Sequence, residues 1–253
     1  DGNGKLSKRD GDRLGFPVFP LEWKDPSTEE VSSGYREKGY FNDAFVNMLA
    51  FLGWNPGTPK EIFSLEELVE AFTLERVGKS GAKFDPDKTK WFNQQYLREK
   101  SNEELGELLM PLVKQHDVCI EYVSDAAGLM KERATFIEDM LDGEYLFVDP
   151  TEFDEKTVRK KWKENSDEII KELTARFESI NKFTSENVES AFKDFLEEKE
   201  LGMGAVLPLF RLVVTGKGMG PSIFDIAALL GKEFVLPRMK NNPEVISSLK
   251  ASA

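Results

Sequence analysis

The sequence predicts a mostly α-helical protein built of several short helices, and three observations support this. Apolar residues recur at spacings of three and four along most of the 253 residues, as they do on one face of a helix. Two capping boxes, Ser64 with Glu67 and Ser101 with Glu104, each indicate the start of a helix. We find no convincing β-hairpin pattern and no internal repeat of about 20–50 residues.

The first third of the chain predicts a loop followed by helices. Residues 1–24 predict an extended, ordered loop, because Pro17 and Pro20 interrupt any regular helix in FPVFPLEW. Residues 34–54 then have helical apolar spacing, with Gly53 placed to end the helix. Further helices are predicted in SLEELVEAFTLERV and, after an Asp-Pro turn, in KTKWFNQQYLREK.

The rest of the chain predicts helices separated by one extended link. Helical patterns occupy ELGELLMPLVKQ, GLMKERATFIEDML, TVRKKWKENSDEIIKELTARFESI and FTSENVESAFKDFLEEKEL, whereas EYLFVDPTEFD is interpreted as the link. Near the end, one helix closes at Gly216 and the next runs from about Ser222 to Gly231. Aromatic residues at helical spacing are predicted to lie in the core. The charged runs VRKKWK and LEEKE are predicted to be solvated faces of amphipathic helices.

Composition excludes several functional classes. With only one histidine and one cysteine, zinc sites and Cys/His catalysis are excluded, and no protein-bound metal is expected. Cys119 is predicted to be a small buried hydrophobe, and His116 to have a structural or surface role. No apolar run is long enough to span a membrane.

The net charge of −12 bears on nucleic-acid binding. A non-specific binder needs excess basic side chains to displace counterions, so the charge counts against that class. A specific binder with its basic residues concentrated on one face stays possible.

The opening segment DGNGKLSKRDGDR combines basic side chains with glycines. Such a loop could neutralise a polyphosphate while its backbone N–H groups approach the ligand. The candidate side chains are Lys5, Ser7, Lys8 and Arg9. From the residues alone this signal is weak, and a flexible basic surface loop is the default interpretation of the segment.

Four segments in order carry a family resemblance. The segment KLSKRDGD is followed by GYFNDAFVNMLAFLGW, EIFSLEELVEAFTLERV and KFDPDKTKWFNQQYLRE, and the match continues through LPLFRLVVTGKGMGPSIFDIAALLGKE. Together they closely resemble bacterial glutamyl-tRNA synthetase over nearly the whole chain. The resemblance implies a class I aminoacyl-tRNA synthetase that joins glutamate to tRNA(Glu) using ATP with Mg²⁺.

In that family the KLSKR segment is the second ATP signature. The resemblance implies that Lys8 stabilises phosphate charge as the adenylate forms and that Lys5 assists, which is electrostatic catalysis. Ser7 and Arg9 complete the implied ATP-binding loop. The family's other ATP signature has paired histidines on a preceding Rossmann domain, and this sequence has one histidine. We therefore expect a C-terminal portion that needs that Rossmann domain as its partner and makes no glutamyl-adenylate alone.

The resemblance also implies a domain organisation. Residues 1–24 would end the catalytic domain, and 25–100 would form a stem-contact domain. Residues 101–145 and 146–253 would form two subdomains of an all-α anticodon-binding region.

Four residues are implied to bind tRNA. Arg133 matches the arginine that inspects the third anticodon base, and Arg211 matches one that contacts the anticodon from the other subdomain. Arginine suits this task because its guanidinium both stacks and forms forked hydrogen bonds. Lys217 and Arg98 are candidate backbone contacts, and the glycines of TGKGMGP indicate a turn rather than a phosphate loop.

Three alternatives stay open: a glutaminyl enzyme, a synthetase-like paralogue that modifies tRNA, and a non-catalytic helical scaffold for protein interaction. The expected state is a cytoplasmic monomer.

Overall fold

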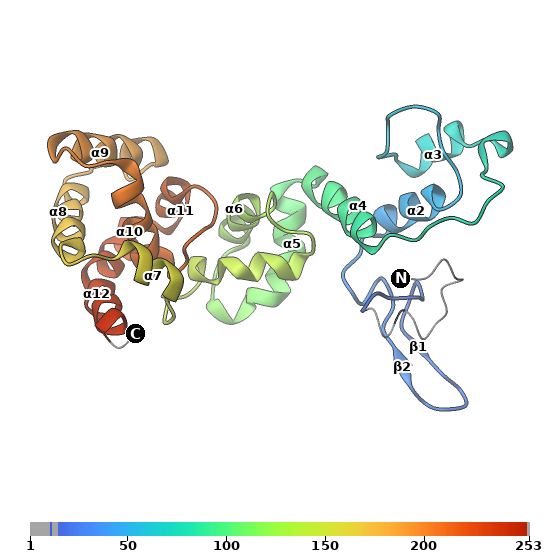
Figure 1. Ribbon diagram of the computed structural model, residues 1–253, viewed down its shortest axis with the longest axis horizontal. Helices are drawn as coiled ribbons and strands as arrows, with labels where there is room; N and C mark the ends of the chain where they lie inside the picture. The colour runs from blue at the N-terminus through green and yellow to red at the C-terminus, as the bar shows by residue number, and fades with distance from the viewer. Residues whose placement is uncertain (1–10, 12–14, 252–253) are drawn as a thin grey trace. The chain divides into compact units, whose positions relative to one another are not determined.

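The computed structural model describes residue 11 and residues 15–251, and most of this part of the chain is helical (Figure 1). The prediction of a mostly α fold is confirmed. The chain divides into two compact units. The first unit contains the chain up to Ser101 together with Lys131–Asp139, and the second contains Asn102–Met130 and the chain from Met140 onward. The basic side chains of the opening loop, Lys5 to Arg9, lie outside the described residues.

The bounds of the helices follow the chain order. In the first unit they are α2 Asn42–Phe51, α3 Leu65–Ala71, η1 Leu74–Arg76 and α4 Pro86–Glu99. In the second unit they are α5 Asn102–Val113, η2 Lys114–His116, α6 Ile120–Met130, α7 Glu155–Lys161, α8 Ser166–Glu178, α9 Ser185–Glu198, α10 Met203–Thr215, α11 Ile223–Leu230 and α12 Lys232–Ala251. The 3₁₀ segment η3, Ile137–Leu146, begins in the first unit and ends in the second.

A short antiparallel ribbon in the first unit was not predicted. Strand β1, Trp23–Lys24, pairs with β2, Val31–Ser32, and the side chain of Asp25 accepts a hydrogen bond from the backbone of Ser27 in the connecting turn. Two-residue strands contain no alternating pattern, so the sequence offered no hairpin signal.

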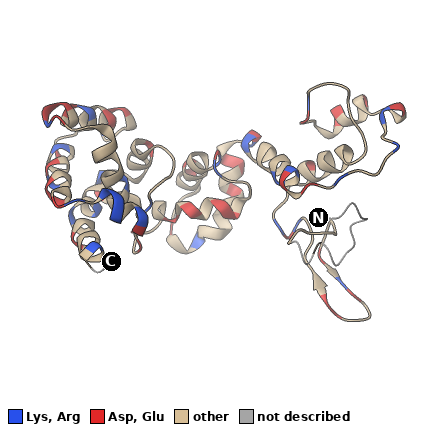
Figure 2. Ribbon diagram, viewed as in Figure 1, with Lys and Arg blue, Asp and Glu red and all other residues tan. Residues whose placement is uncertain are grey.

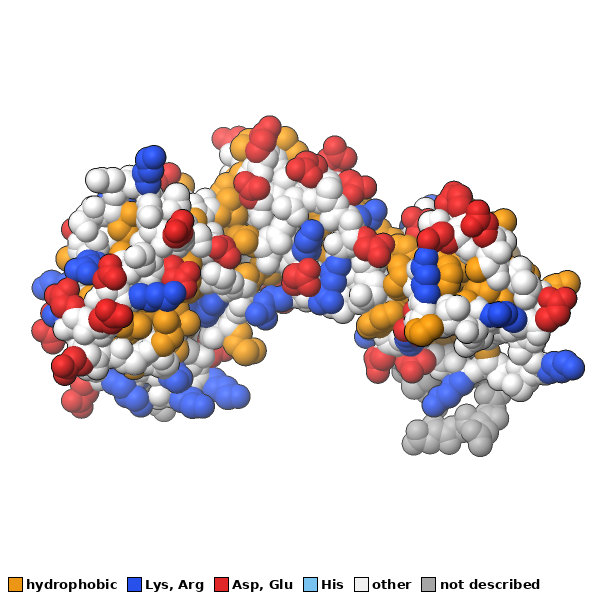
Figure 3. Space-filling model, turned by 90° about the horizontal axis from the view of Figure 1, so that it is seen from above, with side chains coloured by type: hydrophobic (Ala, Val, Ile, Leu, Met, Phe, Trp, Pro, Cys, Tyr) orange, Lys and Arg blue, Asp and Glu red, His pale blue; other side chains and the backbone are white. Residues whose placement is uncertain are grey.

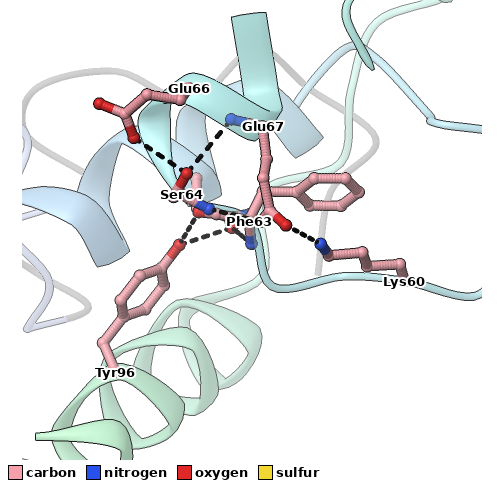
Figure 4. Close-up of polar contacts among 7 residues, drawn as sticks. Lys60, Phe63, Ser64, Glu66, Glu67 and Tyr96 are labelled. Atoms are coloured by element: carbon pink, nitrogen blue, oxygen red, sulfur yellow. Dashed lines mark hydrogen bonds and ion pairs between the residues drawn. The ribbon is translucent and has the colours of Figure 1, made fainter. Parts of the chain in front are cut away.

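The first unit is held together by α2, α3 and α4. The predicted capping box is confirmed: the Ser64 hydroxyl accepts from the backbone of Glu67, and the Glu67 carboxylate accepts from the backbone of Ser64 (Figure 4). The hydroxyl of Tyr96 on α4 lies 2.6 Å from the carbonyl of Phe63 and 2.7 Å from Oδ1 of the fully buried Asn47. Burial raises the pKa of Tyr96 to about 12, so this hydroxyl stays a hydrogen-bond donor.

The second unit has a core in which aromatic rings pack between helices. Phe177 of α8, Phe192 of α9 and Phe210 of α10 are each fully buried, and Phe210 is in ring contact with the other two. The helix ends agree with the prediction, because Gly216 and Gly231 follow α10 and α11 with positive φ. Among residues 15–251, no helix is long and apolar enough to cross a membrane.

Four local predictions were wrong. The helix expected over GLMKERATFIEDML is interrupted, because α6 ends at Met130 and η3 begins only at Ile137. Of the helix expected over 34–54, only α2 forms; the turn before it contains Gly39, whose φ of +80° is incompatible with a helix. The link expected at EYLFVDPTEFD is helical in its first part, because η3 extends to Leu146. Cys119 is exposed. It stands between Asp117, which has a left-handed backbone, and the start of α6, so its chain segment stays at the surface.

Candidate functional site

The candidate residues within the described part of the chain fall into two clusters, one in each unit. Arg133 lies with Arg98 in the first unit, and Arg211 lies with Lys217 in the second.

Arg133 lies on a segment that follows α6 in sequence but packs on α4. The Arg98 guanidinium on α4 donates from Nη2 to the carbonyl of Glu132 at 2.6 Å, and its Nε lies 3.2 Å from the Glu132 carboxylate. Glu132 immediately precedes Arg133, whose side chain is exposed. Arg98 therefore fixes the backbone beside Arg133.

A second anchor holds the other side of Arg133. The fully buried Asn93 on α4 donates from Nδ2 to the carbonyl of Thr135 at 2.7 Å, and its Oδ1 accepts from the backbone of Phe41 at 2.8 Å. Ala134, between the two anchors, is buried. The arrangement presents a solvent-accessible guanidinium on a backbone that is fixed before and after it.

In the second unit, Arg211 projects from α10 toward the turn before α11. It is partly buried, and Nη2 donates to the carbonyl of Pro221 at 2.7 Å. A Cβ added at Gly220 would lie 2.9 Å from Nη1 of Arg211 and 3.4 Å from the hydroxyl of Tyr145. Glycine at position 220 therefore lets this guanidinium occupy the turn without a steric clash.

The turn that carries Lys217 packs against the start of α7. Gly216 ends α10 with φ of +71°, and its carbonyl accepts from the backbone of Asp154 at 2.8 Å. Asp154 caps α7 by accepting from the backbone of Thr157. Hydrogen bonds from Thr157, with smaller contributions from Lys156 and Lys217, lower the pKa of the Asp154 carboxyl. The exposed Lys217 is therefore close to the N-terminal end of α7.

A buried arginine that sequence reasoning missed supports this region. Arg238 on α12 has a side chain that is only 4% exposed, and its guanidinium makes four hydrogen bonds. It donates to the carbonyls of Tyr145, Val148 and Val214 and to the Asp149 carboxylate. The sequence contained a signal, because this arginine lies on the apolar stripe of α12 that also carries the buried Val235 and Met239.

His116 and Cys119 both lie near the surface of the second unit. Both line a surface pocket of about 530 Å³, where the His116 ring stacks on Phe147 at a centroid distance of 5.8 Å. Within residues 15–251, no group of three or more His, Cys, Asp or Glu side chains could hold a metal ion. Guanidinium and ammonium groups dominate the two clusters, and their chemistry is the binding of anions and base edges.

Comparison with known proteins identifies the family. The sequence matches the family described as the anticodon binding domain over residues 95–242, and the class I tRNA synthetase (E and Q) catalytic domain over residues 3–91. It is 52% identical over 249 residues to a glutamate–tRNA ligase of Phocaeicola vulgatus, and 49% identical over 249 residues to one of Bacteroides fragilis. The chain belongs to the glutamate–tRNA ligase family.

The chain spans about half the length of these relatives. Each alignment covers 97% of this chain and 49% of the relative. A crystal structure of a glutamate tRNA ligase from Elizabethkingia meningosepticum, in complex with its amino acid, matches with a TM-score of 0.90 and 42% identity over 99% of this chain and 50% of that one. A glutamate–tRNA synthetase from Elizabethkingia anophelis matches with a TM-score of 0.84 at 41% identity, over 99% of this chain and 49% of that one. The family of these relatives does not favour a glutaminyl enzyme or a non-catalytic scaffold.

Proposed function

We propose that this chain is the tRNA-recognition portion of a glutamate–tRNA ligase and binds tRNA(Glu) through its anticodon. The match of residues 95–242 to the anticodon binding domain carries the proposal, because this range contains both arginine clusters. In this proposal residues 25–100 contact the tRNA stem, and residues 101–145 and 146–253 form the two parts of the anticodon-binding region.

The proposal gives the two anticodon arginines distinct roles. Arg133 contacts the third anticodon base, which separates glutamate from glutamine codons, and Arg211 contacts the anticodon from the second unit. Single-stranded bases are read by planar donors that reach their exposed edges, and an exposed guanidinium on an anchored backbone suits this use. Lys217 contacts phosphate, because it is exposed on the turn that faces Arg211.

For Arg98 the contacts support a different role from the expected one. Its guanidinium is engaged by both the carboxylate and the carbonyl of Glu132. We therefore propose that Arg98 positions Arg133 and does not itself contact the tRNA backbone.

The catalytic part of the proposal concerns the opening loop. Lys5, Ser7, Lys8 and Arg9 are proposed to bind ATP, with Mg²⁺ as its counterion, and Lys8 and Lys5 to stabilise charge that develops on the phosphates. The glutamate-activating reaction further needs a Rossmann domain with the first ATP signature. A cytoplasmic monomer is the proposed state. The purified 253-residue chain should therefore catalyse no glutamate-dependent ATP–pyrophosphate exchange, and measurable exchange would refute this part.

A tRNA titration tests the binding function. Fluorescently labelled transcripts of tRNA(Glu) and tRNA(Gln) are titrated with the chain at 50 mM and 200 mM salt. We expect tighter binding of tRNA(Glu) at both concentrations. Both tRNAs should bind more weakly at the higher concentration, because added salt reduces the free energy gained when counterions are released from the phosphates. No binding, or equal binding of the two tRNAs at both salt concentrations, contradicts the proposal.

A further inference from the structure

The short helix α7 concentrates positive charge in an acidic chain. Residues 154–163 contain five basic and two acidic side chains, although the whole protein has a net charge of −12. The basic residues are Lys156, Arg159, Lys160, Lys161 and Lys163. Helix α9 in the same unit shows the opposite balance, with five acidic residues and one lysine. Figure 2 shows the basic residues of α7 as a blue stretch of ribbon.

The basic side chains of α7 point away from the core. The helix packs through Val158 and the following Trp162, which are both buried, whereas Lys156, Lys160 and Lys163 are exposed. Basic side chains gather along one edge of the surface of this unit (Figure 3). Packing against the core therefore does not explain why this segment contains so many lysines.

Two basic residues of the segment have structural contacts of their own. Arg159 forms an ion pair with Glu155 one turn earlier, at 3.0 Å. Lys161 donates to the carbonyl of Gly204 at 3.2 Å. Within the described part of the chain, Lys156, Lys160 and Lys163 form no comparable ion pair.

The N-terminal end of α7 adjoins the turn that carries Lys217, one of the predicted tRNA contacts. The backbone of Asp154, at the start of α7, donates to the carbonyl of Gly216, and a Cβ added at Gly218 would lie 2.2 Å from Thr157 Oγ1. Lys217 is close enough to lower the pKa of Asp154. The turn after α10 and helix α7 thus form one continuous surface within the second unit.

We propose that Lys156, Lys160 and Lys163 form a binding surface for the sugar–phosphate backbone of the RNA strand that presents the anticodon to Arg211. This inference rests on the proposed function and names the surface that holds the strand. Lys156 and Lys160 lie one turn apart on α7 and Lys163 follows its C-terminal end, and each ammonium group can neutralise a phosphate. Such contacts fix register without reading bases. The surface supplies affinity, while the arginines supply selectivity.

The test compares two triple variants of equal charge. One carries Lys156→Gln, Lys160→Gln and Lys163→Gln. The matched control carries Lys171→Gln, Lys182→Gln and Lys193→Gln, which are exposed residues on or beside α8 and α9 of the same unit. Binding of tRNA(Glu) and tRNA(Gln) is measured from 50 to 300 mM salt, and a thermal melt checks that each variant is folded.

For the α7 variant we expect binding to weaken on the order of 10- to 100-fold at 0.1 M salt. The slope of log affinity against log salt should become shallower by about 2, at roughly 0.7 per lost phosphate contact. The ratio of affinities for tRNA(Glu) and tRNA(Gln) should not change, and the control variant should keep the wild-type slope.

The outcomes separate this inference from the function on which it rests. If the wild-type chain binds no tRNA, the proposed function fails. If it binds and discriminates, but the α7 variant keeps the wild-type slope, only the α7 surface is overturned. Equal losses in the α7 and control variants also overturn it, because the effect would then reflect net charge alone.

Discussion

Replacing Arg238 with methionine tests how the second unit is held together. Methionine fills a similar volume but donates no hydrogen bond, so the carbonyls of Tyr145, Val148 and Val214 would lose their donor. An unsatisfied buried acceptor costs about 1–3 kcal/mol. Because Val148 is only partly buried, water can replace part of this loss, and we expect Arg238→Met to lower the free energy of unfolding by about 3–5 kcal/mol.

Differential scanning calorimetry can measure this effect. For a chain of this size, 1 kcal/mol corresponds to roughly 2–4 °C in Tm, so the expected decrease is about 6–20 °C. Arg238→Lys retains the charge and part of the donor capacity and should fall between the wild type and the methionine variant.

A surface arginine provides the control. Arg176→Met removes the ion pair with Glu198 at the surface, where the Arg176 side chain is 35% exposed, and should change the free energy of unfolding by less than about 1 kcal/mol. The proposed role of Arg238 is refuted if the free energy of unfolding of Arg238→Met lies within 1 kcal/mol of the wild-type value. It is also refuted if Arg238→Met lowers this free energy no more than Arg176→Met does.

Three further predictions concern the sites themselves. Arg98→Met should reduce discrimination between tRNA(Glu) and tRNA(Gln) without changing the salt dependence of binding; a shallower slope with intact discrimination would instead indicate a phosphate contact. Gly220→Ala should weaken tRNA binding by displacing Arg211, measured by titration, while the melting temperature stays within about 2 °C of wild type. Asp154→Ala should cost about 1 kcal/mol in urea unfolding at pH 7 by removing the cap of α7. The folded-state pKa of Asp154 is lowered, so its contribution is present above the unfolded pKa and the difference from wild type should narrow below about pH 4.

Local signals in the sequence predicted the helix ends well. Ser64, Ser222, Gly216 and Gly231 act within four residues of their own positions, and the structure confirms each of them. Apolar spacing also predicted the buried aromatic residues, such as Phe192, because periodicity reports directly which helix face is buried.

Features that depend on distant parts of the chain could not be predicted in this way. Arg238 has its partners 24 to 93 residues away, so nothing near it in sequence reveals what it binds. Likewise, the segment with Arg133 follows α6 but is fixed by Asn93 and Arg98 on α4. The exposure of Cys119 depends on the left-handed turn at Asp117, which apolar composition does not encode.

The candidate site was predicted through family resemblance more than through physical pattern. Arg133 and Arg211 have no local feature that distinguishes them from other arginines, whereas their structural anchors become visible only in three dimensions. The basic run on α7 was interpreted as a solvated helix face, because a single sequence does not show that the turn around Lys217 packs against it.

The most direct test of the central claim measures anticodon selectivity after Arg133→Gln. Dissociation constants for tRNA(Glu) and for the same transcript carrying a glutamine anticodon are determined at 0.1 M salt. We expect binding of the transcript with the glutamate anticodon to weaken by about 1–3 kcal/mol, close to 5- to 150-fold, with little change for the other transcript. An unchanged ratio of the two dissociation constants would contradict the claim that this chain reads the anticodon through Arg133.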